Sequence, residues 1–165
     1  MDMMQKQAVL AQLHTELGFE LPSAYQAILL AFEQLYVGEL ANGQDVGFDA
    51  LAQLLQPFTL IYPNHQRLQA FMADSAHKYP VGQVYRRDTD ALMTTETFAQ
   101  SIMMGGGDDG VYWFWNQSDG AVWDYYLDDG SVGKVAQDFE TWMAGFSLQI
   151  CDEWNVFVDE SDGSE

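Results

Sequence analysis

Apolar residues recur at helical spacing near the start of the chain. The first stripe falls within residues 3–17 and consists of Met4, Val9, Leu13 and Leu17. Gly18 follows it, and glycine readily adopts the left-handed conformation that ends a helix. A second stripe follows Pro22, which is tolerated in the first turn of a helix. Its members are Tyr25, Ile28, Leu29, Phe32, Leu35 and Tyr36. The pattern predicts two amphipathic helices.

The remaining pattern predicts a mixture of helices and strands, bounded by prolines and glycines. The expected elements are a short helix or strand-helix mixture at 47–58, a helix at 64–79, strands at 81–87 and 98–104, a helix from about Ala136 to Phe146, and a strand through Trp154, Val156 and Val158. No internal repeat divides the chain. We expect one domain over residues 1–158, followed by a flexible acidic tail over 159–165.

Between residues 105 and 130 the sequence GGGDDGVYWFWNQSDGAVWDYYLDDG alternates aromatic runs with Asp-Gly pairs. Asp-Gly is typical of two-residue hairpin turns, so two strands are expected around residues 112–116 and 122–127. That turn would pair Trp115 with Asp124 and Trp113 with Tyr126. One face would then form the core, with Tyr112, Phe114, Trp123, Tyr125 and Leu127. The opposite face, with Trp113, Trp115, Asp124 and Tyr126, would be wetter and open to a partner, unless a one-residue slip exchanged the two faces.

Charge narrows the class of partner. The chain has 25 acidic and 6 basic residues, a net charge of -19. Residues 1–87 carry a net charge of −3, and residues 88–165 carry −16. Such a surface repels nucleic-acid phosphate and anionic membrane, and it attracts basic proteins. The alternative is that the acidity only keeps the protein soluble.

Ligand and catalytic sites find little support in the sequence. The three glycines precede Asp108, Asp109 and a strand, whereas a phosphate loop needs a helix N-terminus and no adjacent acids. Neither Asp-Gly turn has EF-hand spacing, although a looser calcium site stays open. Cys151 lies beside Asp152 and Glu153, which raise a thiol pKa and make it a poor nucleophile. We therefore predict no catalytic residue, no metal and no cofactor. Paired carboxylates acting on a carbohydrate stay open.

The chain start lacks a basic region followed by an apolar block, and no apolar run is long enough to span a membrane. The single cysteine cannot form an intrachain disulfide. These features lead us to expect a cytoplasmic protein.

Three motifs, in this order and spacing, resemble the SUKH superfamily, the group named partly for the yeast regulator of cell-wall assembly and glucan synthesis. They are LPSAYQAILLAF, GGGDDGVYWFW and GAVWDYYLDDGSVGKVAQDFETWM. The resemblance covers roughly residues 8–40 and 98–147. Residues 45–97 depart from the family's pattern, and its usual Asp in the first aromatic strand is absent.

The resemblance implies an α+β fold in which helices pack on a curved, mostly antiparallel β-sheet in a single domain. It also implies a non-enzymatic binding module, because bacterial members are commonly immunity proteins that block a toxin, often a nuclease. We expect a basic toxin domain as the partner, with no nucleic acid or membrane involved. The predicted partner-binding residues are Trp113, Trp115, Asp124, Tyr126, Asp108, Asp109, Asp119, Asp128 and Asp129. A regulatory scaffold that binds a cellular protein and a carbohydrate-binding protein are the alternatives.

Overall fold

The computed structural model of the chain describes residues 2–31, 36–40, 45–49, 79–106, 110–152 and 156–158, with single positions at 51, 54, 68, 70, 72 and 73. The helices within these residues are α1 (Met3–Leu17), α2 (Ser23–Ala31) and α5 (Phe139–Met143), with a 3₁₀ turn, η2, at Thr95–Phe98. The strands are β1 (Tyr36–Leu40), β2 (Asp45–Phe48), β3 (Gln83–Arg86), β4 (Ala91–Thr94), β5 (Ser101–Gly106), β6 (Val111–Asn116), β7 (Val122–Tyr126), β8 (Ser131–Ala136), β9 (Phe146–Asp152) and β10 (Val156–Val158).

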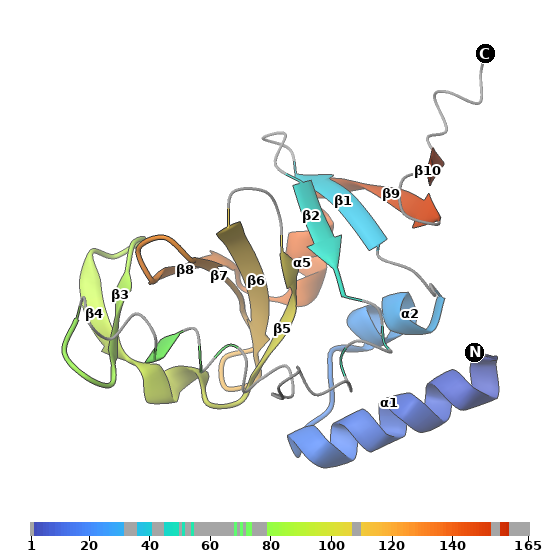
Figure 1. Ribbon diagram of the computed structural model, residues 1–165, viewed down its shortest axis with the longest axis horizontal. Coiled ribbons are helices and arrows are strands. Elements are labelled where there is room, and N and C mark those ends of the chain that lie inside the picture. The colour runs from blue at the N-terminus through green and yellow to red at the C-terminus, as the bar shows by residue number, and fades with distance from the viewer. Residues whose placement is uncertain are drawn as a thin grey trace.

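The strands form two sheets (Figure 1). The larger has the order β4-β3-β8-β7-β6-β5, and the smaller has the order β10-β9-β1-β2. All neighbouring strands are antiparallel except β3 and β8, which pair in parallel at Arg86 and Val132. The predicted α+β fold with a mostly antiparallel sheet is confirmed. The acidic tail predicted at 159–165 lies outside the described residues.

The first predicted helix is confirmed at both ends. The Asp2 carboxylate accepts a hydrogen bond from the Gln5 backbone N–H at 2.8 Å, and the Gln5 side chain accepts one from the Asp2 N–H at 2.9 Å. This reciprocal pair is a capping box. At the other end Gly18 has φ 82° and its N–H bonds the His14 carbonyl. The buried face is rotated from the predicted stripe, because Lys6, Leu10 and Leu13 are buried whereas Met4 is 79% exposed.

Two helices are shorter than predicted, because residues predicted at their ends belong to strands instead. The helix after Pro22 is α2, whose described residues end at Ala31; Phe32 and Leu35 lie outside the described residues, and Tyr36 begins β1, where it pairs with Phe48. The helix predicted from Ala136 to Phe146 is only α5, since Ala136 ends β8 and Phe146 begins β9. Asp138 caps α5 by accepting a hydrogen bond from the Thr141 N–H at 2.7 Å. These extents are corrections in which tertiary pairing overrides helical periodicity.

The other predicted elements are confirmed in part. Gly47 and Phe48 belong to β2, and Leu51 and Leu54 are helical. Within 64–79, Leu68, Ala70, Met72 and Ala73 are helical, whereas Tyr79 lies in a bend. The strand predicted at 81–87 is β3, and the one at 98–104 starts only at Ser101 because η2 precedes it. Val156 and Val158 lie in β10, and Trp154 is outside the described residues.

The aromatic hairpin is confirmed, with its register shifted by two residues. Trp113 pairs with Asp124 and Phe114 with Trp123, because the turn has four residues rather than two. The Gly120 N–H bonds the Asn116 carbonyl at 2.8 Å, and the Asp119 carboxylate accepts a bond from the Ala121 N–H. A shift of two preserves the side of each residue, since side chains alternate with period two. The predicted division into two faces is therefore right, although Leu127 falls in the next turn and is 47% exposed.

Over β5 and β6, both faces of the larger sheet are covered by the protein's own chain. The helix face, defined as the side that carries Val111, Trp113, Trp115 and Val122, packs against α1, α2 and α5. The opposite face carries Phe114, Trp123, Tyr125 and Val132, which pack with Leu68, Met72 and Phe98. The prediction that the Trp113 side is wet is wrong over β6, where the helices bury Trp113 and Trp115 to 1% and 8% exposure.

The two sheets meet at a glycine. Gly105 in β5 has φ 159°, and a Cβ there would lie 1.8 Å from the Gly47 carbonyl oxygen. The Asp49 N–H also bonds the Met104 carbonyl at 2.8 Å. Only glycine allows this close approach of two backbones.

Candidate partner-binding surface

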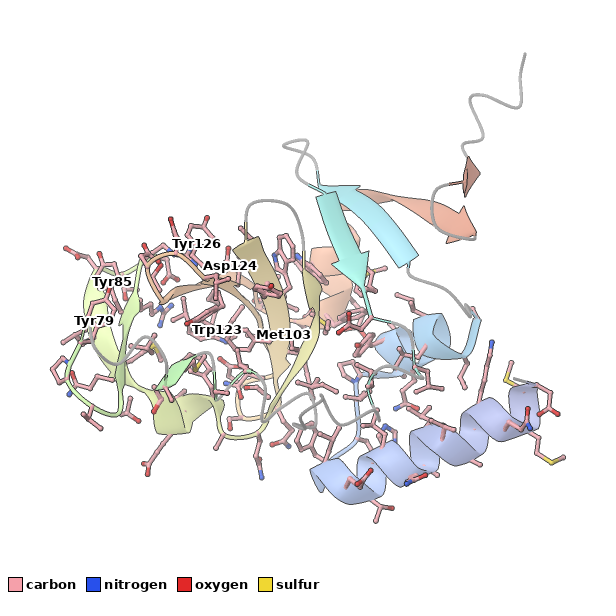
Figure 2. All side chains as sticks on the ribbon, in the orientation of Figure 1. Tyr79, Tyr85, Met103, Trp123, Asp124 and Tyr126 are labelled. Atoms are coloured by element: carbon pink, nitrogen blue, oxygen red, sulfur yellow. The ribbon has the colours of Figure 1, made fainter. Side chains whose placement is uncertain are left out.

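Beyond the helices, the helix face of the larger sheet is open toward β8, β3 and β4. Tyr126 pairs with Ser131, and the Arg86–Val132 pair places Tyr85 beside Ser131 on the same face. Tyr85 in turn pairs with Leu92. A single row of side chains thus crosses four strands. We call the exposed and half-buried members of this region the Tyr85–Tyr126 surface; they are Tyr79, Tyr85, Arg87, Leu92 and Tyr126. Figure 2 shows Tyr79, Tyr85 and Tyr126 at the end of the molecule away from α1.

A polar network fixes Arg87 in the middle of this surface. Its Nη2 donates to the Asp124 carboxylate at 2.7 Å, and its Nε donates to the Ser131 hydroxyl at 2.6 Å. The Ser131 hydroxyl donates to the Asp129 carboxylate at 2.6 Å. The guanidinium carbon lies 3.5 Å from the centroid of the Tyr126 ring, a cation–π geometry. Arg87 is therefore held in one position before any partner binds.

Asp124 is the buried end of this network. Its side chain is 10% exposed, and burial raises the pKa of its carboxyl, although the hydrogen bond and charge of Arg87 oppose that rise. Gly133 pairs with Asp124 on β8, and a Cβ there would lie 2.8 Å from Arg87 Nη1. The guanidinium thus occupies space that any other residue at position 133 would fill.

Tyr85 is held by a second contact. Its hydroxyl donates to the Asp90 carboxylate at 2.6 Å, and this hydrogen bond is the main cause that raises the pKa of Tyr85. The Tyr85 and Tyr79 rings stack with centroids 6.1 Å apart. Asp90 has φ 55°, a left-handed conformation that aspartate tolerates better than most residues. The aromatic part of the surface is therefore rigid as well.

The structure brings together only part of the predicted partner-binding set. Asp124, Tyr126 and Asp129 lie in or beside the Tyr85–Tyr126 surface, and Asp128 is exposed in the same turn as Asp129. Asp119 lies in the turn at the opposite end of β7, where its carboxylate accepts from Trp123 Nε1 and pairs with Lys134. Asp108 and Asp109 lie outside the described residues.

Trp113 and Trp115 are core residues rather than exposed anchors. The Trp113 ring lies 6.1 Å from that of Trp142 in α5. Trp115 Nε1 donates to the Gly120 carbonyl at 3.0 Å, so its polar atom is satisfied within the chain. The expectation that these two indoles present themselves to a partner is corrected, because α5 and the N-terminal helices cover them.

Tyr79, Tyr85, Arg87 and Leu92 were missed by the sequence analysis. The strand that contains Tyr85 was predicted, and its alternation alone places Tyr85 and Arg87 on the face opposite to Val84. The parallel neighbour β8 lies more than forty residues further along the chain, as the Arg87–Ser131 hydrogen bond shows. No local pattern specifies that pairing.

Positive charge is compensated around this sheet. Arg86 pairs with Asp88 at 2.7 Å and lies over Trp123 on the opposite face, and Lys134 pairs with Asp119.

Among the described residues, no group of three or more His, Cys, Asp or Glu side chains could hold a metal ion. The helices described here are all too short or too polar to cross a bilayer.

The fold and this surface define an α+β protein whose cores are closed and whose exposed sheet end is aromatic and charged. The model of the SMI1 / KNR4 family (SUKH-1) matches residues 6–145, and the chain belongs to this family. Membership supports a protein-interaction or immunity-type module in general terms. No curated protein and no solved structure gives a significant match to the chain.

Proposed function

We propose that this protein is an immunity protein that binds a basic toxin domain and neutralises it without catalysis, in the cytoplasm. The observation that carries the proposal is the Tyr85–Tyr126 surface, a rigid aromatic and arginine patch on a family member with a net charge of -19. Family membership supports a binding role, and the charge selects the class of partner.

The composition of the surface suits protein recognition. Tyrosine and arginine are enriched among the residues that dominate binding energy, and charged residues such as lysine and glutamate are depleted there. Arg87 is already fixed by Asp124 and Ser131, so binding would cost little of its rotamer freedom. Leu92, which is 47% exposed, adds apolar area at the edge.

Acidic turns border the same surface and make its surroundings negatively charged. Asp90 precedes β4, and Asp128 and Asp129 precede β8. Complementary charge of this kind mainly accelerates association and rejects acidic partners. A basic nuclease domain fits this requirement, because an acidic inhibitor can occupy its phosphate-binding surface.

The experiment first searches the neighbouring genes for a secreted protein with a basic C-terminal domain, and then co-expresses that domain with this protein in bacteria. Wild type is expected to restore growth, whereas Tyr85→Ala and Tyr126→Ala are expected to lose most of that protection. Met4→Ala is the matched control, since Met4 is 79% exposed on α1, away from the surface. If wild type fails to restore growth of cells that express the toxin domain, the proposal is wrong. Recovery of a housekeeping protein in a pull-down, or binding on a glycan array, would favour a regulatory scaffold or a carbohydrate binder instead.

A further inference from the structure

The outer edge of the larger sheet is open at β4. Strand β4 pairs only with β3, so its other side has no neighbouring strand among the described residues. At the opposite edge, β5 is approached by β2, and the Asp49 N–H bonds the Met104 carbonyl. We propose that the open edge of β4 binds an extended segment of a basic partner protein as an added strand. This inference rests on the proposed function, because it assumes the same basic partner.

The register identifies which backbone groups are available. The Thr95 N–H bonds the Gly82 carbonyl at 2.9 Å, which makes this a hydrogen-bonded pair of the antiparallel ladder. Hydrogen-bonded and non-bonded pairs alternate, so Met93 and Ala91 bond to β3, whereas Leu92 and Thr94 direct their backbone groups outward. The N–H groups of Leu92 and Thr94 and the carbonyl of Leu92 therefore line the open edge. An incoming strand needs such a row of donors and acceptors.

The sequence of β4 leaves this edge unprotected. Besides keeping an edge strand short, as β4 is with 4 residues, natural proteins guard it with lysine, proline, a bulge or an inward-pointing charge. Strand β4 is Ala-Leu-Met-Thr, which contains no charge and no proline, and it pairs with β3 without a register shift. An unguarded edge on an otherwise acidic protein favours pairing with another chain.

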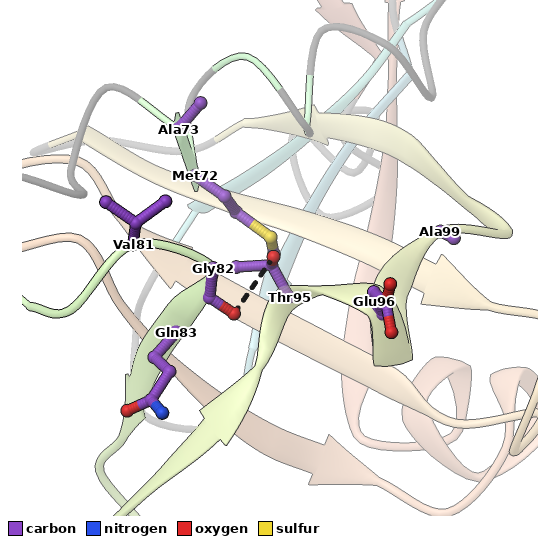
Figure 3. Close-up of a pocket in the computed structure, with 8 residues that line it drawn as sticks. All are labelled: Met72, Ala73, Val81, Gly82, Gln83, Thr95, Glu96 and Ala99. Carbon is purple, nitrogen blue, oxygen red and sulfur yellow. Dashed lines mark hydrogen bonds between the residues drawn. The ribbon is translucent and has the colours of Figure 1, made fainter.

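A hollow lies where β3 begins and β4 ends, and we infer that it accepts one side chain of the incoming strand. It has a volume of about 490 Å³, and Met72, Ala73, Val81 and Ala99 supply its apolar lining (Figure 3). Gln83 and Glu96 supply its polar lining. Asp90 directly precedes β4, and Glu96 lies two residues after its end, so both ends of the edge are acidic. The occupant that fits is a strand with apolar residues in its middle and lysine or arginine toward its ends.

The same charges disfavour a second copy of this chain as the occupant. Antiparallel pairing of two β4 strands would bring Asp90 of one copy near Glu96 of the other, and like charges across a strand pair are destabilising. Each copy also carries a net charge of -19.

The test mixes the full chain with a short peptide that has valines in its middle and lysines at its ends, and records amide NMR spectra of the protein. We expect the peptide to shift the Leu92 and Thr94 amides and to slow their hydrogen exchange. Methylation of alternate peptide nitrogens, or replacement of its lysines by glutamates, is expected to abolish these effects. Leu92→Pro removes an outward N–H without breaking the β3 ladder and should abolish binding, whereas the matched control Leu92→Thr keeps the N–H and should bind.

Three outcomes would contradict the proposal that β4 binds an added strand. They are an absence of shifts at Leu92 and Thr94, equal binding of the N-methylated peptide, and self-association of the chain through β4. If Leu92→Pro fails to fold, the N-methylated peptide on wild type still decides the matter. If the peptide does not affect the Leu92 and Thr94 amides but the toxin domain is still neutralised, the added strand is wrong and the proposed function is retained. Peptide binding without any toxin protection removes the proposed function and retains only an edge that binds basic strands.

Discussion

The guanidinium of Arg87 lies between the Asp124 carboxylate, at 2.7 Å, and the Tyr126 ring, whose centroid is 3.5 Å from the guanidinium carbon. Arg87 follows β3, whereas Asp124 and Tyr126 belong to β7, so the contact reaches over β8. One side chain thus joins three strands and sets the shape of the exposed sheet end.

Gly133→Ala should displace Arg87 while leaving the fold intact. The new Cβ would lie 2.8 Å from Arg87 Nη1 and 3.1 Å from the Asp124 carboxylate, and the flexible arginine can move away. We expect a loss of about 1–3 kcal/mol in the free energy of unfolding, as for other overpacked sites. Urea unfolding measures it, with Gly145→Ala as the control, because there the nearest atom is 3.4 Å away. Unchanged stability and unchanged partner binding in Gly133→Ala would contradict the role given to this contact.

Asp124 should make the protein less stable as pH rises. Burial raises the pKa of its carboxyl above the ordinary value of 3.8, so the folded state holds the proton more tightly than the unfolded state. This contribution to stability is complete below about 3.8 and disappears as pH rises through the raised pKa. We therefore expect the stability of wild type relative to Asp124→Asn to fall over that window. A carboxyl NMR titration that places the Asp124 midpoint below 3.8 would refute this.

The contribution of Asp88 to stability should change with pH in the opposite direction to that of Asp124. The hydrogen bond from Arg86 lowers the pKa of the Asp88 carboxyl below 3.8, so its contribution is present above 3.8 and is lost as pH falls through the lowered pKa. Both side chains of this pair are partly exposed, at 26% and 35%, and solvent screening limits the contribution to less than about 1 kcal/mol. Urea unfolding of Asp88→Asn and wild type, at those pH values between 2 and 6 where both are folded, tests the direction of this change in the free energy of unfolding. A stability difference that grows on acidification would be inconsistent with this pair.

Trp113→Ala should act on stability rather than on a binding surface. The Trp113 side chain is 1% exposed and packs against Trp142, and truncation of a buried tryptophan typically costs about 3–5 kcal/mol. Met4→Ala, at a position 79% exposed, should change stability by less than about 0.5 kcal/mol. Thermal and urea unfolding compare the two variants. A Trp113→Ala protein as stable as wild type would show that the indole is not part of the core.

Gly105→Ala should be among the most damaging small substitutions. A Cβ at position 105 would lie 1.8 Å from the Gly47 carbonyl oxygen, a backbone atom that cannot rotate away, and the residue has φ 159°. The two sheets must separate locally, and we expect a loss of several kcal/mol, on the order of other large steric effects. Gly120→Ala provides the comparison, since a Cβ there meets nothing within 4 Å and the strain comes from its φ of 70° alone. Equal stability of the two variants would argue against the close approach.

The hairpin shows why local patterns predict faces better than register. Alternation assigned Trp113 and Phe114 to opposite sides correctly, because a shift of two residues leaves every side chain on its own face. The turn length itself was wrong, since Asp119 and Gly120 form part of a four-residue turn rather than a two-residue one. The Asp-Gly pair marks the presence of a turn, whereas its length depends on the Asn116 contacts at the base of the turn.

Exposure was harder to predict than secondary structure. The face that carries Trp113, Trp115 and Tyr126 has mixed polarity. Only the placement of α5 and the N-terminal helices decides that its tryptophan end is buried while Tyr126 is half-buried. Likewise, the pairing of β3 with β8 joins Arg87 to Ser131 across 44 positions of sequence. Contacts of this range depend on the whole topology, so the Tyr85–Tyr126 surface has no signature in any single segment.

The central claim is that the Tyr85–Tyr126 surface binds a basic toxin domain. The most direct measurement is titration calorimetry of the purified chain against a basic toxin domain found among the products of its neighbouring genes. We expect one-to-one binding that weakens with salt. Tyr85→Ala and Tyr126→Ala should each lose about 2 kcal/mol or more of binding free energy, the scale of a central interface residue, while Met4→Ala binds as wild type. Absence of binding by wild type, or tight binding that both tyrosine variants retain in full, would contradict it.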